Sequence, residues 1–335
     1  MSIVVPKGYK PLIDKRMTEK AIKFVKDTFE RELSSELKLS RVTSTLFVPT
    51  GSGINDDLSG VERPVRFEVG NLNNKKLEIV HSLAKWKRMV LADQDFKKGT
   101  GLYTDMDAIR PDDLMDNIHS IYVDQWDWEL VMGEDQRDLD FLMFIVSKIY
   151  EAIKRTEFLV SESYPKCKPT LPENITFIDS QDLLDMYPDL TPVEREKAAA
   201  KKYGAVFVIG IGSKLSDGVE HGLRAPDYDD WSLNGDIIVW DTVRKDSLEL
   251  SSMGIRVNKE ALVKQLKISG KEERLNLYWH KRLMAGEFPQ TIGGGIGQSR
   301  LCMFLLKKAH IGEVQASVWS DEDIKTAEEN GIPLL

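Results

Sequence analysis

Residues 290–301 read QTIGGGIGQSRL, a stretch with four glycines in five positions that ends in an arginine and a leucine. Glycine has no Cβ atom, so a backbone built from it can approach another group closely. The apolar run 301–306 and the two lysines after it predict a buried helix. A glycine-rich turn before a helix is a typical phosphate site, because free N–H groups point outward there. The alternative is a tight turn packed against its neighbours, and the glycines alone leave both open.

Arg300 adds a planar cation to this stretch, and such a group can stack on a base or hold a phosphate through two hydrogen bonds. The common glycine-rich phosphate loops do not fit. A P-loop requires a lysine and then a serine or threonine after the glycines, and neither follows here. The stretch also lies near the C-terminus with no βαβ unit after it, which excludes a Rossmann fingerprint.

The composition is that of an ordinary globular enzyme, with 335 residues of which 41% are hydrophobic and 30% charged. A net charge of −8 argues against a general affinity for nucleic acid. Cys167 and Cys302 lie far apart without metal-ligand spacing, so we expect neither a disulfide framework nor a structural zinc site. No apolar run approaches the ~18 residues of a membrane span, and the first residues do not resemble a signal peptide. We therefore expect a cytoplasmic protein.

Hydrophobic periodicity outlines the secondary structure. Helices are predicted over residues 15–39, 81–91, 139–159, 260–268, 272–285 and 301–308. Strands are predicted over residues 41–49, 65–69, 76–80, 120–128, 175–179, 205–211, 237–240 and 247–255. We expect a polar loop over 50–60 and a loosely docked polar tail from residue 320. Because strands joined by short turns are as frequent as strands that alternate with helices, the pattern favours an α+β fold with a mainly antiparallel sheet flanked by helices. No linker divides the chain, so a single domain over 1–335 is expected.

Polar side chains alternate with tryptophans in residues 124–129, DQWDWE. In a strand, Gln125, Asp127 and Glu129 share one face, and Asp124 lies on the other face with the tryptophans. Three polar groups on one face are costly to bury without partners. We favour a polar cavity on this face; the alternative is an edge strand with a solvated face.

Other charged residues allow both functional and ordinary interpretations. Asp236 and Glu249 carry oxygen ligands of the kind that suit Mg²⁺, although their spacing alone favours ordinary hairpin acids. A run of cations such as the one in residues 81–88 most often lies on a solvated helix face. Arg110 precedes a proline, which fits a strand end or a surface loop. The five histidines form no HxxxH pair and the chain has no GxSxG, so a serine or cysteine nucleophile has little support.

Six blocks together resemble the aspartate–ammonia ligase family, the ammonia-dependent asparagine synthetases, which are similar to the catalytic core of class II aminoacyl-tRNA synthetases. They follow the family's order and cover residues 81–88, 101–104, 122–129, 224–231, 249–256 and 290–301. The resemblance implies that ATP drives the joining of L-aspartate and ammonia through an aspartyl-adenylate, giving asparagine, AMP and pyrophosphate. It also implies a homodimer with a class II synthetase-like fold.

The resemblance assigns roles to individual residues. Arg110 matches the arginine that holds the α-phosphate, and Arg300 the one that stacks on adenine. Asp236 and Glu249 match the acids that hold Mg²⁺ against the phosphates. The residues that match the aspartate pocket are Asp56, Lys87, Gln125, Asp127, Ser252 and Arg256.

The glycines and two acids complete the expected site. Gly294 would lie against aspartate, and Gly295 and Gly297 against ATP, so we expect a side chain at Gly294 or Gly295 to impair binding more than folding. We hypothesise that Asp56 or Asp229 binds ammonium and takes its proton.

Several observations separate the remaining alternatives. Position 2 is serine, whereas glutamine-dependent synthetases carry an N-terminal cysteine there, so ammonia is the expected nitrogen donor. A tRNA synthetase would need an anticodon-binding module, and the residues before the first helix are too few to build one. A regulatory paralogue without activity would be expected to lack Arg110, Arg300 or the metal acids. Only Ser232 and Leu233 separate Trp231 from Asn234, a shorter connection than in some relatives, which leaves open how Asp229 and Asp230 are capped.

Overall fold

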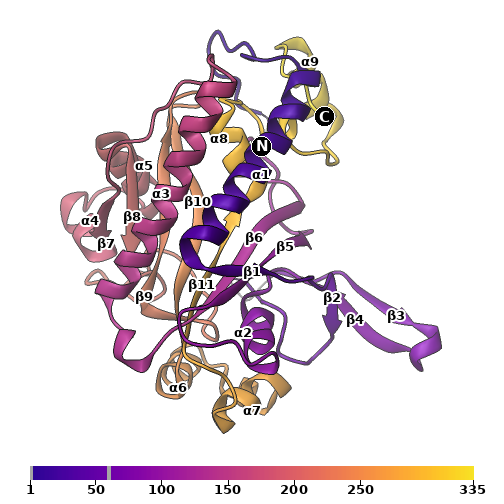
Figure 1. The fold of residues 1–335 in the computed structure, drawn as a ribbon, viewed down its shortest axis with the longest axis vertical. Helices are drawn as coiled ribbons and strands as arrows, with labels where there is room; N and C mark the ends of the chain where they lie inside the picture. Colours follow the sequence, from indigo (N-terminus) through magenta and orange to yellow (C-terminus); the bar gives the residue numbers. More distant parts are fainter. Residues whose placement is uncertain (1–2, 59–61) are drawn as a thin grey trace.

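The glycine stretch is a strand near the middle of the main sheet, and the predicted turn is wrong. The computed structural model describes residues 3–58 and 62–335. Strand β11 (Thr291–Gly297) pairs antiparallel with a neighbour on each side, so its backbone groups are satisfied by the sheet. Helix α8 (Gln298–Leu305) follows at once (Figure 1). The predicted helix is present but begins three residues earlier than the apolar run.

The main sheet has eight strands in the order β1-β5-β6-β11-β10-β9-β8-β7. Their bounds in that order are Leu39–Arg41, Gly101–Ile109, Tyr122–Val131, Thr291–Gly297, Asp246–Arg256, Asp229–Asp241, Ala205–Ile209 and Thr176–Asp179. Only the outermost pairs, β1 with β5 and β7 with β8, are parallel. The expected α+β fold with a mainly antiparallel sheet is confirmed.

Long helices cover one face of this sheet. Helix α1 (Lys15–Leu37) and helix α3 (Leu139–Ser163) lie against each other in front of the strands in Figure 1. Phe29 of α1 packs on Trp126 of β6, with ring centroids 4.8 Å apart. Both tryptophans of β6 are fully buried here and add a large apolar surface to this layer. The remaining helices are α2 (Ala84–Asp93), α4 (Ser180–Met186), α5 (Pro192–Tyr203), α6 (Lys259–Ile268), α7 (Tyr278–Ala285) and α9 (Asp321–Glu329), with short 3₁₀ turns η1 (Gly70–Leu72), η2 (Glu134–Gln136), η3 (Glu272–Asn276) and η4 (Ile311–Glu313).

A second, three-stranded sheet projects from the body of the molecule (Figure 1). It consists of β2 (Phe47–Pro49), β4 (Lys75–Ile79) and β3 (Arg66–Val69). The β3–β4 hairpin confirms the predicted pair 65–69 and 76–80. The single strand predicted over 41–49 is wrong, because its two ends belong to different sheets. The predicted polar loop 50–60 is irregular as far as residue 58, and its last two residues lie outside the described part of the chain.

Other helix and strand boundaries differ from the predicted ones. The helix predicted from residue 81 begins at Ala84, and the N–H groups of His81 and Leu83 before it donate to the side chains of Asn55 and Asp127. Strand β9 begins at Asp229 rather than 237, and β6 reaches Val131. Residues 101–109, which have no strong alternation, were not predicted as a strand.

The polar tail docks more firmly than expected. Helix α9 buries Ala327, and Ile332 is buried after it. The final residue, Leu335, donates its N–H to the carbonyl of Gly312. Among the described residues, no helix combines the length and the apolar character that crossing a membrane requires.

The two faces of β11 meet different surroundings. A Cβ built on Gly294 would point at the helix-covered side, 2.5 Å from the Cβ of Met253 and 2.6 Å from the carbonyl oxygen of Ser252. A Cβ on Gly295 would point to the opposite, open side, 2.4 Å from Oε1 of Gln125 and 2.7 Å from Oδ1 of Asp127. Only the second set of atoms lies at the free ends of side chains.

We therefore expect Gly294→Ala to destabilise the fold, which reverses the expectation from the sequence for this residue. The Cβ would press on the β10 backbone, an overpacking that costs about 1–3 kcal/mol. Urea unfolding should show this loss. Gly295→Ala is the matched control and should unfold close to the parent protein, because side-chain ends can move aside. Equal losses in both variants would contradict the assignment of the two faces.

Candidate active site

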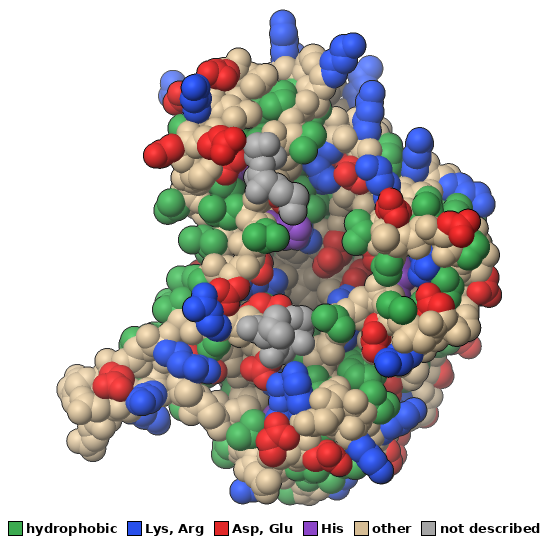
Figure 2. Space-filling view, turned by 180° about the vertical axis from the view of Figure 1, so that it is seen from behind, with side chains coloured by type: hydrophobic (Ala, Val, Ile, Leu, Met, Phe, Trp, Pro, Cys, Tyr) green, Lys and Arg blue, Asp and Glu red, His purple; other side chains and the backbone are tan. Residues whose placement is uncertain are grey.

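The open face of the sheet carries a polar cavity of about 240 Å³. Strands β6, β11 and β10 form its floor, and the face is visibly hollowed in Figure 2. The predicted residues that line it are Asp56, Lys87, Arg110, Gln125, Asp127, Asp229, Glu249, Ser252, Arg256, Gly294 and Gly295. They come from seven separate segments of the chain, so the structure gathers nearly the whole predicted set at one place.

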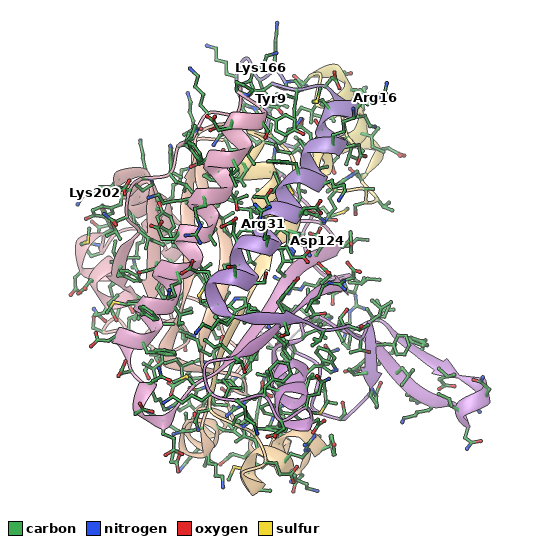
Figure 3. All side chains as sticks on the ribbon, in the orientation of Figure 1. Tyr9, Arg16, Arg31, Asp124, Lys166 and Lys202 are labelled. Atoms are coloured by element: carbon green, nitrogen blue, oxygen red, sulfur yellow. The ribbon has the colours of Figure 1, made fainter. Side chains whose placement is uncertain are left out.

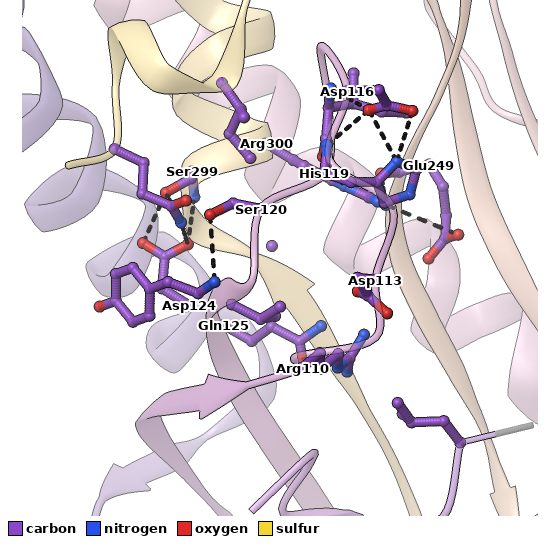
Figure 4. A pocket seen from close by; sticks show the side chains of 18 of the residues that line it. Arg110, Asp113, Asp116, His119, Ser120, Asp124, Gln125, Glu249, Ser299 and Arg300 are labelled. Carbon is purple, nitrogen blue, oxygen red and sulfur yellow. Dashed lines mark hydrogen bonds and ion pairs between the residues drawn. The ribbon is translucent and has the colours of Figure 1, made fainter. Parts of the chain in front are cut away.

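A wider cavity of about 830 Å³ adjoins the first (Figure 4). The two share Leu58, Arg110, Gln125, Glu249 and Gly295 in their linings. Gly297 and Arg300, both predicted to contact nucleotide, line the wider cavity. Asp236 lines neither and lies behind Arg224, which reaches the smaller cavity.

The deep end of the smaller cavity is held by a buried arginine between two carboxylates. Arg256 is 2% exposed; its Nε and Nη2 donate to Glu129 at 2.7–3.0 Å, and its Nη1 donates to Asp229 at 2.5 Å. Burial favours a raised pKa for Glu129, but the ion pair with Arg256 outweighs it and lowers that pKa. Burial raises the pKa of Asp229 despite the same arginine. Asp229 is thus the better proton acceptor of the two carboxylates.

The interior position of β6 explains the alternation in residues 124–129. Trp126 and Trp128 are buried in the core, and Gln125 and Asp127 line the cavity on the other face. The polar-cavity interpretation is confirmed, and the edge-strand alternative is wrong, because β6 lies between β5 and β11.

The cations of helix α2 are buried rather than solvated. Lys87 is 1% exposed; its Nζ lies 3.3 Å from Asp127 and donates to the carbonyl of Gly294 at 2.8 Å. Burial lowers the pKa of Lys87, against the opposing effect of Asp127. Lys85 pairs with Asp227, and Arg88 donates to the carbonyl of Val257 at 2.7 Å. The alternative of a solvated helix face is wrong for the two lysines.

Asp56, Asp229 and Asp230 are each held by hydrogen bonds from other residues. Asp56 accepts from the N–H of Leu58 and from the hydroxyl of Ser82, both at 2.8 Å, so a loop residue is held at the cavity wall. The short connection after Trp231 is part of β9, and it leaves neither neighbouring acid uncapped. Asp229 is paired with Arg256, and Asp230 accepts from Arg137 at 2.5 Å.

The start of helix α8 is less open to an anion than the sequence suggested. Asp124 accepts from the N–H and the hydroxyl of Ser299 at 3.0 and 2.8 Å. It lies at the start of β6, facing α1 in Figure 3, where Lys26 contacts it at 3.1 Å. A protein carboxylate therefore already uses the helix N-terminus, and the cations of the wider cavity are left to bind an anion.

Two arginines reach into the wider cavity from opposite ends. Both arginines are labelled in Figure 4. Arg110 donates to the carbonyl of His81 at 3.0 Å, and Arg300 donates to the carbonyl of Glu249 at 3.1 Å. Each guanidinium has five N–H donors and uses only a few of them on the backbone. His119, which pairs with Asp116 at 2.9 Å, also lines this cavity and had no distinguishing signal in the sequence. Arg224 and Tyr228 line the smaller cavity and stood out in the sequence only through the block 224–231.

The two predicted metal acids fit a divalent cation in part. Oδ2 of Asp236 accepts from Arg224, whereas its Oδ1 is buried without a protein partner. Burial raises the pKa of Asp236 to about 6, and the negative charge of Glu249 adds to the rise while Arg224 opposes it. No three acidic, histidine or cysteine side chains converge as a metal site within 3–58 and 62–335. A cation there would need ligands from a bound substrate.

Replacing Arg256 tests the buried ion pairs. Arg256→Met would leave Glu129 and Asp229 buried without a counter-ion, which should cost about 3–5 kcal/mol of unfolding free energy. Chemical denaturation near neutral pH measures this. Arg282→Met is the matched control, because Arg282 also pairs with two acids, Asp93 and Glu287, but at the surface, where the loss should stay below about 1 kcal/mol. A loss of that small size for Arg256→Met would contradict the account.

Comparison with known proteins identifies the family. A family model described as aspartate–ammonia ligase matches residues 16–331. The chain is 59% identical over 342 residues to the aspartate–ammonia ligase of Parabacteroides distasonis, covering 99% of each chain. It is 56% identical over 333 residues to that of Clostridium perfringens, again covering 99% of each.

Solved structures with the same fold are tRNA synthetases. Asparaginyl-tRNA synthetase of Pyrococcus horikoshii, complexed with asparaginyl-adenylate, matches with a TM-score of 0.68 at 14% identity, covering 91% of this chain and 70% of that one. The Entamoeba histolytica enzyme matches at 0.66 and 13%, covering 90% of this chain and 66% of that one. The chain thus spans about two thirds of these synthetases, and the likeness shows a class II synthetase-like fold. With a family match over nearly its whole length, the chain belongs to the aspartate–ammonia ligase family.

Proposed function

We propose that this chain joins ammonia to L-aspartate at the expense of ATP, and that its two adjoining cavities hold the two halves of an aspartyl-adenylate. The products are asparagine, AMP and pyrophosphate. The observation that carries the proposal is the shared lining of the cavities, where Arg110, Gln125 and Gly295 stand between the small polar chamber and the wide one. An amino acid joined to a nucleotide needs such a junction.

The smaller cavity suits aspartate in size and charge. Lys87 and Arg256 supply the positive charge for carboxylates, with Arg256 offering a planar fork and Lys87 a compact ammonium group. Gln125, Asp127 and Ser252 supply acceptors and donors for the amino group and remaining oxygens. Gly295 leaves the floor bare, so that the substrate can lie on the strand itself.

Arg110 would act on the first step. An oxygen of the aspartate side-chain carboxylate attacks the α-phosphorus, the bond to the bridging oxygen of the β-phosphate breaks, and pyrophosphate leaves. Negative charge builds on the α-phosphoryl oxygens, and a positioned guanidinium stabilises it without reorganising water. Arg300 and Gly297 would hold the nucleotide in the wider cavity, and alignment of the reactants lowers the barrier further.

Asp236 and Glu249 would hold Mg²⁺ together with phosphate oxygens. The partnerless Oδ1 of Asp236 and the neighbouring charge of Glu249 favour a cation at this place. Bound Mg²⁺ would neutralise the charge of the phosphates.

Asp56 and Asp229 would serve the second step. They bind ammonium, and one carboxylate takes a first proton. The nitrogen then attacks the carbonyl carbon of the adenylate, AMP leaves, and the other carboxylate takes the second proton that the nitrogen loses. The raised pKa of Asp229 brings it closer to that of a useful base.

The domain organisation, the cellular location and the oligomeric state of the chain are also proposals. We propose one catalytic domain over 1–335 that acts as a cytoplasmic homodimer, without a nucleic-acid partner. The alternative of a tRNA-dependent enzyme has the fold in its favour, but the net charge of −8 disfavours tRNA. Filter binding with tRNA and light scattering on the purified chain distinguish these possibilities.

Arg110→Ala should cripple the first step. We expect aspartate-dependent exchange of pyrophosphate into ATP to fall by about 10²–10³-fold, as for other lost transition-state donors. Arg31→Ala is the control, since Arg31 lies on α1 with a 67% exposed side chain on the covered side of the sheet. Normal exchange in Arg110→Ala would refute the assignment.

Asp56→Asn and Asp229→Asn should impair the second step more than the first. We expect a higher KM for ammonium and a kcat for asparagine lower by about 10²-fold or more, with pyrophosphate exchange largely retained. Asp230→Asn is the matched control, because Asp230 neighbours Asp229 but pairs with Arg137 and does not line the cavity. Unchanged KM and kcat in both cavity variants would remove the ammonium role.

A further inference from the structure

A buried charge cluster lies just behind the wall of the smaller cavity. Its centre is Asp227, which is fully buried and whose Oδ2 accepts from three cationic or polar groups. Lys85 donates at 3.1 Å, Arg274 at 3.0 Å and His280 at 2.9 Å. Burial lowers the pKa of His280 despite Asp227, so a neutral imidazole that donates from Nε2 fits the site. None of these four residues lines the cavity, and the reaction described above does not use them.

Arg274 is the member of this cluster that reaches beyond it. Its Nη1 donates to Asp227, and its Nη2 pairs with Asp57. Asp57 directly follows Asp56, and Asp227 lies two residues before Asp229. One guanidinium therefore ties together the two loops that deliver the proposed ammonium carboxylates.

Trp279 and His280, which follow Arg274 in the chain, contact the loop of Asp56 at two more points. The carbonyl of Ser52 accepts from the N–H of Trp279 at 3.1 Å. Gly53 has a φ of +75°, and a Cβ there would lie 2.9 Å from Nδ1 of His280, so the loop backbone packs directly on α7. Trp279 in turn donates to the carbonyl of Lys85 at 2.7 Å, which links the brace to helix α2. The loop thus packs on α7, and Arg274 makes the only ion pair to Asp57 within residues 3–58 and 62–335.

We propose that Arg274 is a positioning residue that sets the separation of Asp56 and Asp229, and with it the geometry in which ammonium is held and deprotonated. The inference rests on the proposed role of these two acids. An arginine suits this role, because its planar fork holds two N–H groups at a fixed separation and directs each to a different carboxylate, whereas a lysine must reach both from one nitrogen. The Asp227 end is anchored by Lys85 as well, and the Asp57 end is anchored by Arg274.

Arg274 joins a buried acid, Asp227, to a partly exposed one, Asp57. Variants at these two contacts therefore differ in how far they endanger folding. Arg274→Gln removes both contacts but leaves Asp227 its counter-ion Lys85, so no uncompensated buried charge remains. Asp57→Asn removes only the outer contact, and the Asp57 side chain is 49% exposed, so this change does not endanger folding.

The experiment compares the two half-reactions in each variant. We expect Arg274→Gln to raise the KM for ammonium by about tenfold or more, because small misplacements of reacting groups cost this much. Asp57→Asn should raise it by about threefold to tenfold, and Arg274→Lys should not restore it. Aspartate-dependent pyrophosphate exchange, which needs no ammonium, should stay within about twofold of the parent in all three. Arg282→Gln is the control, since Arg282 makes a similar double ion pair in α7 away from the cavity.

The outcomes separate this inference from the proposed function. If Asp56→Asn raises the KM for ammonium but Arg274→Gln and Asp57→Asn do not, the positioning role is overturned and the ammonium role stands. If Asp56→Asn and Asp229→Asn also leave it unchanged, the proposed ammonium site itself has failed. If Arg274→Gln lowers pyrophosphate exchange and thermal stability together while Asp57→Asn keeps the parent KM, Arg274 is only structural and the inference is again overturned.

Discussion

Strand β11 must pass between β6 and β10 without side chains on the open face at Gly293, Gly295 and Gly297, and the rest of the site depends on this. A Cβ on Gly293 would fall 2.1 Å from Glu129 and 2.6 Å from Arg256, so the buried ion pair occupies space that only glycine leaves. A Cβ on Gly295 would meet Gln125 and Asp127. The polar side chains of the two neighbouring strands can therefore lean over the bare strand and form the walls of a cavity whose floor is backbone.

The charges around this floor stabilise one another. Arg256 lies between Glu129 and Asp229, Lys87 beside Asp127, and Lys85 and Arg274 around Asp227. Such buried pairs contribute little net stability but are costly to break singly, so they are better understood as devices that hold functional groups in place. The strands that carry these ion pairs are stabilised from the opposite side of the sheet, where Trp126, Trp128 and helices α1 and α3 form the main core.

Much of this could be predicted from the sequence. Strong periodicity located the long helices and the β3–β4 hairpin, and the alternation in residues 124–129 separated the cavity face of β6 from its core face. The six family blocks named residues that the fold then brings to one face. The predictions that were wrong mostly concern features that depend on contacts with distant parts of the chain. The glycines of β11 look like a turn because nothing local reveals two strand partners. The two lysines of α2 look solvated because their acidic partners, Asp127 and Asp227, lie 40 and 142 residues away in the chain. The proposed role of Arg274 had no local signal, since it depends on two loops meeting in space.

The central claim is that aspartyl-adenylate lies across the junction of the two cavities on the bare face of β11. A crystal structure with a non-hydrolysable aspartyl-adenylate analogue tests it most directly. The account predicts the aspartyl group on Gly295 between Lys87 and Arg256, the phosphoryl mimic beside Arg110 and the adenine against Arg300. An analogue bound with its aspartyl group away from Gly295, or with its base away from Arg300, would contradict the account.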